Sequence, residues 1–236
     1  MFIILFLTKS TGVKMEFLLD TANIEEIKKY IEIYPITGVT SNPSILKTEG
    51  KIDLFSHMQK IRSIIGSERT LHIQVIAKDH AGMMLDAEKI LKHVDKDVYI
   101  KVPTTEEGLK VMKELKKDNI NVTATAIYNR IQGFMAIACG VDYIAPYFNR
   151  MENLDEDSTS IIADFRQIID RNNAVTKILA ASFKNVAQVN NALIAGAHSM
   201  TLQPATLHAG FGSYMVEKAV DDFYNDWKNV QGKGSI

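Results

Sequence analysis

Short β-like runs alternate with amphipathic helical stretches from Met15 to the end of the chain. Runs rich in Val, Ile, Thr and aromatic residues predict strands, and apolar residues at helical spacing predict helices between them. The predicted strands are eight in number and cover residues 16–21, 36–42, 71–77, 97–103, 121–127, 141–147, 177–182 and 199–204. This alternation predicts parallel strands, because a helical crossover brings the chain back to start the next parallel strand.

Eight strand–helix units in about 220 residues predict an α/β fold of one domain, a compact (β/α)₈ or TIM barrel. A doubly wound open sheet is the alternative, but no G-x-G-x-x-G or Walker phosphate loop occurs in the chain. We expect the barrel and a C-terminal helix to cover residues 15–236. Residues 1–14 are expected to be an upstream extension, with Met15 as the natural start, because Met15 opens the first predicted strand and the short apolar run before it cannot span a membrane.

Composition narrows the class of protein. The chain has 236 residues, of which 46% are hydrophobic and 23% charged, and its formal net charge is −1. Nucleic acids and anionic membranes attract basic proteins, so neither is an expected partner. The single cysteine, Cys139, excludes a disulfide framework and favours a cytoplasmic location. We expect Cys139 to be a small structural residue near the end of a buried helix.

A lysine stands in the middle of one predicted strand, within the sequence "DVYIKVPTT" at residues 97–105. Val98, Ile100 and Val102 share the apolar face of this strand, and Lys101 falls on the opposite face. An unpaired cationic lysine is costly to bury. The position of Lys101 therefore favours a functional role for its amine.

Polar residues occupy the same inward-facing phase on other strands. When the apolar positions face outward toward the helices, seven strands each carry an inward polar residue at or near the C-terminal end. These residues are Asp20, Asn42, Gln74, Lys101, Thr125, Tyr147 and Ser182. The alternatives are structural: helix caps, turns, satisfied backbone groups or an ion pair between Lys101 and Asp20. Catalytic groups of (β/α)₈ barrels lie at this end of the strands, so the shared phase favours an active site.

Carbonyl condensation is the chemistry that suits a buried lysine. A partly dry pocket shifts the amine toward its neutral form, which can attack a ketone or aldehyde and form a Schiff base. The iminium then allows an adjacent carbon–carbon bond to break, without a metal or other cofactor. Arg150 in "APYFNR" and Ser182 in "LAASFK", together with Lys184, are candidate ligands for a phosphate group. A surface arginine and a helix-capping serine are the alternative.

The six histidines do not favour a metal site. None of them forms H-E-x-x-H or another close ligand pair. His72 faces inward by phase but lies deeper in the barrel than Gln74, so we expect a core histidine.

Six motifs resemble the small transaldolase and fructose-6-phosphate aldolase family. In chain order they are "LDTAN", "GVTSNPS", "IKVPTTEEGL", "APYFNR", "LAASFK" and "FYNDW". The resemblance runs from Met15 to the C-terminal tail. It implies a (β/α)₈ barrel and a class I mechanism without cofactor, acting on sugar phosphates and dihydroxyacetone.

The matching motifs also imply residue roles. Lys101 would be the Schiff-base lysine, and Asp20 would be a catalytic residue that contacts the dihydroxyacetone unit. The residues implied for substrate binding are Thr40 and Asn42 for hydroxyl groups, and Arg150 and Ser182 for the phosphate of the aldehyde partner.

Two positions separate the two activities of the family. Small transaldolases carry a glutamate on the third strand and a phenylalanine on the sixth, whereas this chain has Gln74 and Tyr147, the aldolase pattern. Tyr147 and Gln74, with Thr125, would position a water that protonates the enamine and releases dihydroxyacetone. The resemblance favours an aldolase that reversibly cleaves fructose 6-phosphate to dihydroxyacetone and glyceraldehyde 3-phosphate. The alternatives are a transaldolase and a catalytically silent barrel that binds sugar phosphates or scaffolds an assembly.

The C-terminal helix is a candidate for assembly. The family forms rings whose C-terminal helices pack on neighbouring subunits, and "EKAVDDFYNDW" carries Phe223 and Trp227 on one face. This favours a ring-type homo-oligomer, with a decamer as one candidate, and packing of the helix on its own barrel is the alternative. The loop after strand eight departs from the family's pattern, so Gln203 and His208 are candidates for selecting the acceptor.

Overall fold

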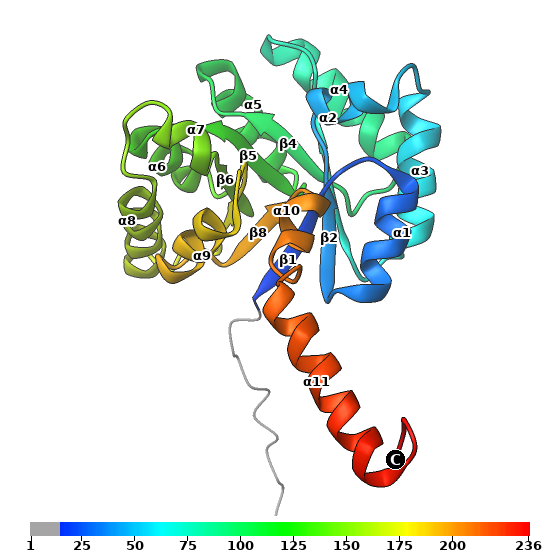
Figure 1. Ribbon diagram of the computed structural model, residues 1–236. Helices are drawn as coiled ribbons and strands as arrows, with labels where there is room; N and C mark the ends of the chain where they lie inside the picture. The colour runs from blue at the N-terminus through cyan, green and yellow to red at the C-terminus, as the bar shows by residue number, and fades with distance from the viewer. Residues whose placement is uncertain (1–14) are drawn as a thin grey trace, which may run out of the picture.

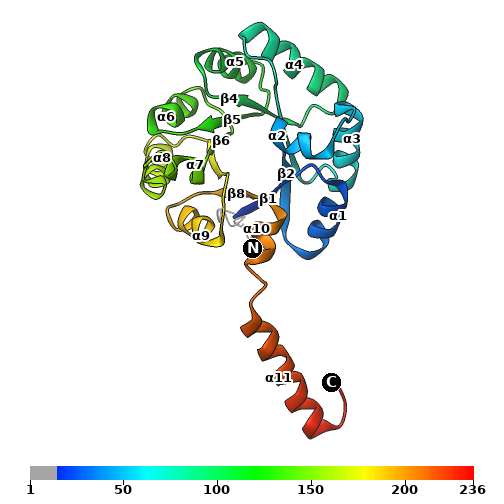
Figure 2. The ribbon, with the colours of Figure 1, turned by 45° about the horizontal axis from the view of Figure 1, so that its top comes forward.

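The computed structural model describes residues 15–236, and the expected upstream extension at 1–14 lies outside the described residues. Eight parallel strands form a closed barrel in sequence order, and β8 pairs with β1 (Figures 1 and 2). The strands are β1 (Glu16–Asp20), β2 (Ile36–Thr40), β3 (Thr70–Gln74), β4 (Tyr99–Pro103), β5 (Val122–Ile127), β6 (Tyr143–Pro146), β7 (Lys177–Ala180) and β8 (Ser199–Leu202). Each one overlaps a predicted strand, and the predicted single-domain (β/α)₈ barrel is confirmed.

The helices other than α11 lie around the barrel in the view of Figure 2. The helices of residues 15–236 are α1 (Ile24–Ile33), α2 (Pro43–Leu46), α3 (Leu54–Ile65), α4 (His80–His93), α5 (Glu106–Lys117), α6 (Arg130–Ala138), α7 (Phe148–Glu152), α8 (Ser158–Arg171), α9 (Val186–Ile194), α10 (Pro204–Ala209) and α11 (Tyr214–Gln231), with one 3₁₀ turn, η1 (Lys47–Glu49). Gly140 and Gly196 follow α6 and α9 with φ of 73° and 104°, a left-handed conformation that glycine adopts readily just after a helix. Cys139 is partly buried at the C-cap of α6, near the expected helix end.

The main core lies between the barrel and its helices. Ile73, Ile100 and Val102 point outward from their strands and are at most 1% exposed, as their apolar phase predicts. Because these side chains fix which face of each strand is outward, the intervening residues face the barrel interior. The apolar positions thus orient the polar residues of the candidate site.

Side chains fill the barrel interior on the N-terminal side of the polar strand ends. His72 is fully buried, stacks on Tyr99 with ring centroids 4.6 Å apart, and meets Tyr143 edge-on. Its ring nitrogens lie 2.8 Å from the Thr123 hydroxyl and 3.0 Å from the Thr70 hydroxyl. Burial lowers the pKa of His72 well below its usual range, so the ring is neutral. The predicted core histidine is confirmed.

The chain leaves the barrel after α10, and α11 projects away from it (Figures 1 and 2). None of the residues of α11 is buried, and Phe223 is 71% exposed. The alternative that this helix packs on its own barrel is therefore not found. Among the described residues, no helix is both long and apolar enough to cross a membrane.

Candidate active site

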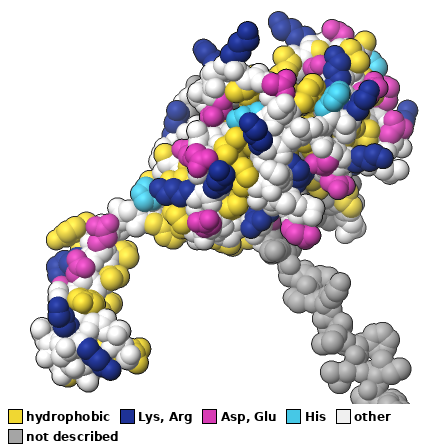
Figure 3. Space-filling view, turned by 90° about the vertical axis from the view of Figure 1, so that its right-hand side faces the viewer, with side chains coloured by type: hydrophobic (Ala, Val, Ile, Leu, Met, Phe, Trp, Pro, Cys, Tyr) yellow, Lys and Arg dark blue, Asp and Glu magenta, His cyan; other side chains and the backbone are white. Residues whose placement is uncertain are grey.

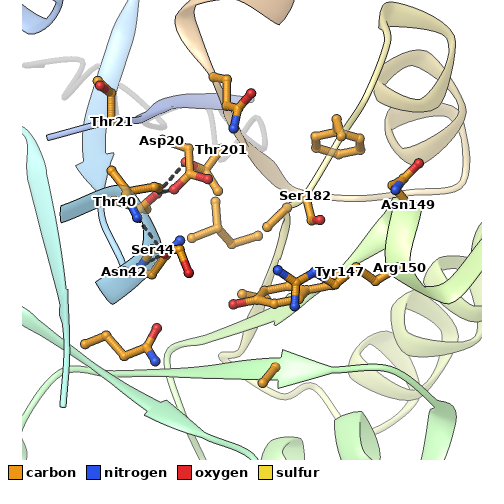
Figure 4. A pocket seen from close by; sticks show the side chains of 18 of the residues that line it. Asp20, Thr21, Thr40, Asn42, Ser44, Tyr147, Asn149, Arg150, Ser182 and Thr201 are labelled. Atoms are coloured by element: carbon orange, nitrogen blue, oxygen red, sulfur yellow. Dashed lines mark hydrogen bonds between the residues drawn. The ribbon is translucent and has the colours of Figure 1, made fainter. Parts of the chain in front are cut away.

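A cavity of about 780 Å³ lies at the C-terminal ends of the strands. Its lining includes eight of the nine predicted site residues, of which Figure 4 labels all but Gln74 and Lys101. These eight are Asp20, Thr40, Asn42, Gln74, Lys101, Tyr147, Arg150 and Ser182. The ninth, Thr125, is fully buried and reaches the cavity through its contact with Tyr147. The nine residues come from seven different strands or the loops that follow them, and they converge on one site.

The amine of Lys101 lies on the wall of this cavity, although the residue is only 4% exposed. Its Nζ donates a hydrogen bond to the Ser41 carbonyl oxygen at 2.9 Å. Burial lowers the pKa of Lys101, and the nearby charge of Asp20 opposes that shift. The two side chains form no direct ion pair among the described contacts, so the purely structural alternative is not favoured. The site holds a shielded amine biased toward its neutral form.

Asp20 ends β1 beside this amine. Burial raises the pKa of its carboxyl group, whereas the charge of Lys101 and a hydrogen bond from Thr40 lower it. Thr40 Oγ1 donates to Asp20 Oδ1 at 2.7 Å and lies 2.6 Å from Thr201 Oγ1 (Figure 4). The N-cap of α1 is Asn23 rather than Asp20. The Asp20 carboxyl is therefore available to exchange protons with a bound molecule.

Another part of the wall carries the polar groups of Gln74 and Tyr147, with Thr125 behind Tyr147. The Thr125 hydroxyl lies 3.1 Å from the Tyr147 hydroxyl. Gln74 Oε1 is buried and has no hydrogen-bond partner among residues 15–236, and β3 pairs this residue in register with Lys101. An unpaired buried acceptor is costly unless a bound molecule donates to it. Burial raises the pKa of Tyr147, so the phenol stays protonated and can donate a hydrogen bond.

Asn42 lies after β2 rather than in the strand. It caps a helix, which is one of the structural alternatives considered for the inward polar residues. Its Oδ1 accepts from the backbone N–H groups of Ser44 at 2.9 Å and Ile45 at 3.1 Å, which caps α2. The cap fixes the side chain at the cavity wall. Its Nδ2 group makes none of these bonds and can donate to a hydroxyl group in the cavity.

The far end of the cavity is basic. The Arg150 guanidinium lies 5.1 Å from the centroid of the Tyr147 ring and donates to the Tyr128 hydroxyl at 2.9 Å. Ser182 follows β7 in the left-handed region, with φ of 63°, and it lines the cavity with Lys184. Two cations and a hydroxyl group at one end suit a phosphate group.

Sequence reasoning missed several residues of this site. Thr201, Tyr128 and Asn149 all line the cavity. Thr201 could have been found from the inward phase of β8. Tyr128 lies in a loop and Asn149 in a helix, where the alternation of a strand does not indicate which way a side chain points. Gln203 lines the cavity and His208 does not, which leaves Gln203 as the candidate for acceptor selection.

Within residues 15–236, no three His, Cys, Asp or Glu side chains are grouped so that they could hold a metal ion.

The comparisons with known proteins agree with this geometry. The Transaldolase/Fructose-6-phosphate aldolase family model matches residues 17–234. A relative from Streptococcus pneumoniae, described as a probable fructose-6-phosphate aldolase, is 53% identical over 222 residues. That alignment covers 94% of this chain and 100% of the relative. The chain belongs to the transaldolase/fructose-6-phosphate aldolase family.

Proposed function

We propose that the protein is a class I aldolase that reversibly cleaves fructose 6-phosphate to dihydroxyacetone and glyceraldehyde 3-phosphate. The observation that carries the proposal is Lys101, whose amine lines a polar cavity while the residue is 4% exposed. Its lowered pKa increases the fraction of neutral amine at a given pH, and only the neutral amine is nucleophilic.

The first half of the reaction forms and uses the Schiff base. Neutral Lys101 Nζ adds to the C2 ketone, and loss of water gives an iminium. The Asp20 carboxylate takes the proton of the C4 hydroxyl, the C3–C4 bond breaks, and its electron pair moves into the iminium to give an enamine. Glyceraldehyde 3-phosphate leaves as the aldehyde. Asp20 is suited to this step because its raised pKa makes the carboxylate a stronger base than an exposed one.

The second half decides between cleavage and transfer. A water molecule bonded to Gln74 Oε1 and the Tyr147 hydroxyl would protonate the enamine at C3, with Thr125 orienting the phenol. Hydrolysis of the resulting iminium releases dihydroxyacetone and restores the Lys101 amine. A phenylalanine in place of Tyr147 could not hold such a water, so this wall favours an aldolase over a transaldolase.

The substrate would lie along the cavity with its phosphate at the basic end. Arg150 and Ser182 would hold the phosphate, with Lys184 adding charge. Thr40 and the Nδ2 group of Asn42 would contact the hydroxyl groups nearer Lys101.

A single assay separates the two family activities. Release of dihydroxyacetone from fructose 6-phosphate is measured without an acceptor aldehyde and with erythrose 4-phosphate. The proposal requires release without acceptor at a rate comparable to the transfer rate. Turnover that depends on erythrose 4-phosphate would instead establish a transaldolase, and the absence of both would favour a binding protein.

We further propose that the protein acts in the cytoplasm as a ring-type homo-oligomer in which α11 packs on a neighbouring copy, a decamer being one such assembly. The exposed apolar residues of α11 support this assembly. Figure 3 draws hydrophobic side chains in yellow, and several lie along this helix. They include Met215, Val220, Phe223 and Trp227. An apolar groove of about 280 Å³ between α9, α10 and the start of β2 offers a surface for such a helix.

The assembly is tested by light scattering on the full chain. The parent should be oligomeric, and Phe223→Glu should dissociate it, because a carboxylate cannot be buried in an apolar groove without a partner. Lys218→Glu on the same helix, at a side chain that is half exposed in an ion pair, serves as the charge control. A monomeric parent would refute the proposal.

A further inference from the structure

We propose that Thr201 is a positioning residue, and that Thr201 and Thr40 form a reversible hydrogen-bond relay serving Asp20 in both its ionised and its protonated form. This inference rests on the proposed function, in which the Asp20 carboxyl takes up a proton during cleavage and returns it afterwards.

The relay crosses three adjacent strands of the barrel. Asp20 lies on β1, between Thr40 on β2 and Thr201 on β8, and Figure 4 shows the three side chains together. The Thr40 hydroxyl lies 2.7 Å from Asp20 Oδ1 and 2.6 Å from the Thr201 hydroxyl. Thr40 is 0% and Thr201 is 3% exposed, so neither hydroxyl has bulk water as an easy substitute partner.

Counting protons fixes the direction of the bonds. Each threonine hydroxyl has one proton, and an ionised carboxylate has none. When Asp20 is ionised, Thr40 must donate to Asp20, and Thr201 must then donate to Thr40. When Asp20 carries the proton, it can donate to Thr40, and Thr40 can donate to Thr201. Rotation of two O–H groups satisfies both states without movement of heavier atoms.

Thr40 controls the hydrogen bonding of the Asp20 carboxylate. Within residues 15–236, its hydroxyl is the one side-chain or backbone donor that bonds to this carboxylate. A hydroxyl that accepts a hydrogen bond becomes a stronger donor, so Thr201 strengthens the bond from Thr40 to the carboxylate. Loss of the Thr201 hydroxyl therefore weakens a bond that favours the ionised form.

Other charged and titratable groups face Asp20 and must be held constant in the test. Lys101 on β4 favours the ionised carboxylate, and the Tyr147 phenol approaches from the N-cap of α7, just after β6. Glu26 on α1 lines the same cavity and accepts a hydrogen bond from the Thr21 hydroxyl at 2.8 Å. None of these groups contacts the Thr201 hydroxyl, so a change at Thr201 alters Asp20 through Thr40.

The test is Thr201→Val, which keeps the shape of the side chain and removes the hydroxyl. Cleavage needs the ionised carboxylate, so the acidic limb of the pH profile of kcat should move up by about half a pH unit. Thr201→Ser should restore the parent midpoint, because it restores the hydroxyl. Thr176→Val is the matched control: it removes another buried threonine hydroxyl, bonded to the Val141 carbonyl oxygen at 2.6 Å, and should leave the midpoint unchanged.

A second readout is independent of activity. The carboxyl ¹³C resonance of Asp20, identified by its absence in Asp20→Asn, is titrated in the parent, in Thr201→Val and in Thr201→Ser. The same upward shift in Thr201→Val alone is expected, and Thr201→Ala replaces that variant if it does not fold. An unchanged midpoint without the hydroxyl, or failure of serine to restore it, would overturn the relay. A parent that does not cleave fructose 6-phosphate would overturn the proposed function, while this titration would still decide the relay.

Discussion

Replacement of Tyr147 by phenylalanine tests how the enamine is protonated. The substitution removes one hydroxyl, whose partner is the Thr125 hydroxyl at 3.1 Å, and leaves the ring in place beneath the Arg150 guanidinium. It also removes one of the two groups proposed to hold the water, the other being Gln74 Oε1. The steps before the enamine do not use this phenol, so they should proceed as in the parent.

The size of the effect follows from the role of the phenol. A positioned general acid contributes about 10² to 10⁴-fold to a proton transfer. Because Gln74 and Thr125 remain, we expect the low end, a loss of about 100-fold or about 2.7 kcal/mol in the barrier to protonation. The buried Thr125 hydroxyl loses its partner, which should lower the free energy of unfolding by about 1 kcal/mol.

The assay follows release of dihydroxyacetone without acceptor and transfer to erythrose 4-phosphate in the same preparation. Tyr147→Phe should lose acceptor-free release by about 100-fold and lose transfer by less than about fivefold, since transfer consumes the enamine before protonation. Tyr128→Phe is the matched control. It removes a neighbouring tyrosine hydroxyl that bonds to Arg150 rather than to Thr125, so acceptor-free kcat should stay near the parent value.

Two results would refute this reasoning. Equal loss of release and transfer would place the phenol in Schiff-base formation or bond cleavage rather than in protonation. Unchanged release in Tyr147→Phe would exclude the phenol from proton transfer altogether.

Three further predictions follow from the same structure. Arg150→Gln should raise the KM for fructose 6-phosphate by about 10 to 100-fold, because the phosphate loses a charged partner. The KM for unphosphorylated dihydroxyacetone should stay unchanged, and steady-state kinetics with both compounds checks this. The cleavage rate should fall as the pH drops through the raised pKa of Asp20, which protonates the base, and a midpoint at or below the ordinary 3.8 would contradict this. Gly133→Ala should lower the free energy of unfolding by about 1–3 kcal/mol in urea titrations, because the new Cβ would lie 2.2 Å from the Phe165 ring. A stabilised variant would show that the ring can move.

The fold was predictable because strand phase is a local property of the sequence. Outward residues such as Ile100 and Val102 are apolar because helices cover them, and that pattern also sets Lys101 inward. Inward polar residues at successive strand ends converge in any closed barrel, so most of the cavity wall followed from the same phase.

Long-range hydroxyl contacts were not predictable in this way. Thr201 is a β-branched residue in a strand, and such residues are common there without any chemical role. Its significance comes from Thr40, which is 161 positions away in the sequence and meets it only once the barrel closes. Tyr128 and Arg150 likewise meet across two different βα segments.

Side chains with two roles also limit what a sequence can predict. Asn42 Oδ1 caps α2, and this capping role leaves its Nδ2 group for a ligand. For α11, periodicity predicts a helix with an apolar face but does not specify what that face contacts.

The central claim is a nucleophilic amine at Lys101, and reductive trapping tests it most directly. The protein is incubated with dihydroxyacetone and sodium borohydride, digested and mapped by mass spectrometry, with Lys101→Met as the control. We predict one reduced adduct on the peptide that contains Lys101, and none in Lys101→Met. The absence of an adduct in the parent, or an adduct that forms on another lysine and persists in Lys101→Met, would contradict the account.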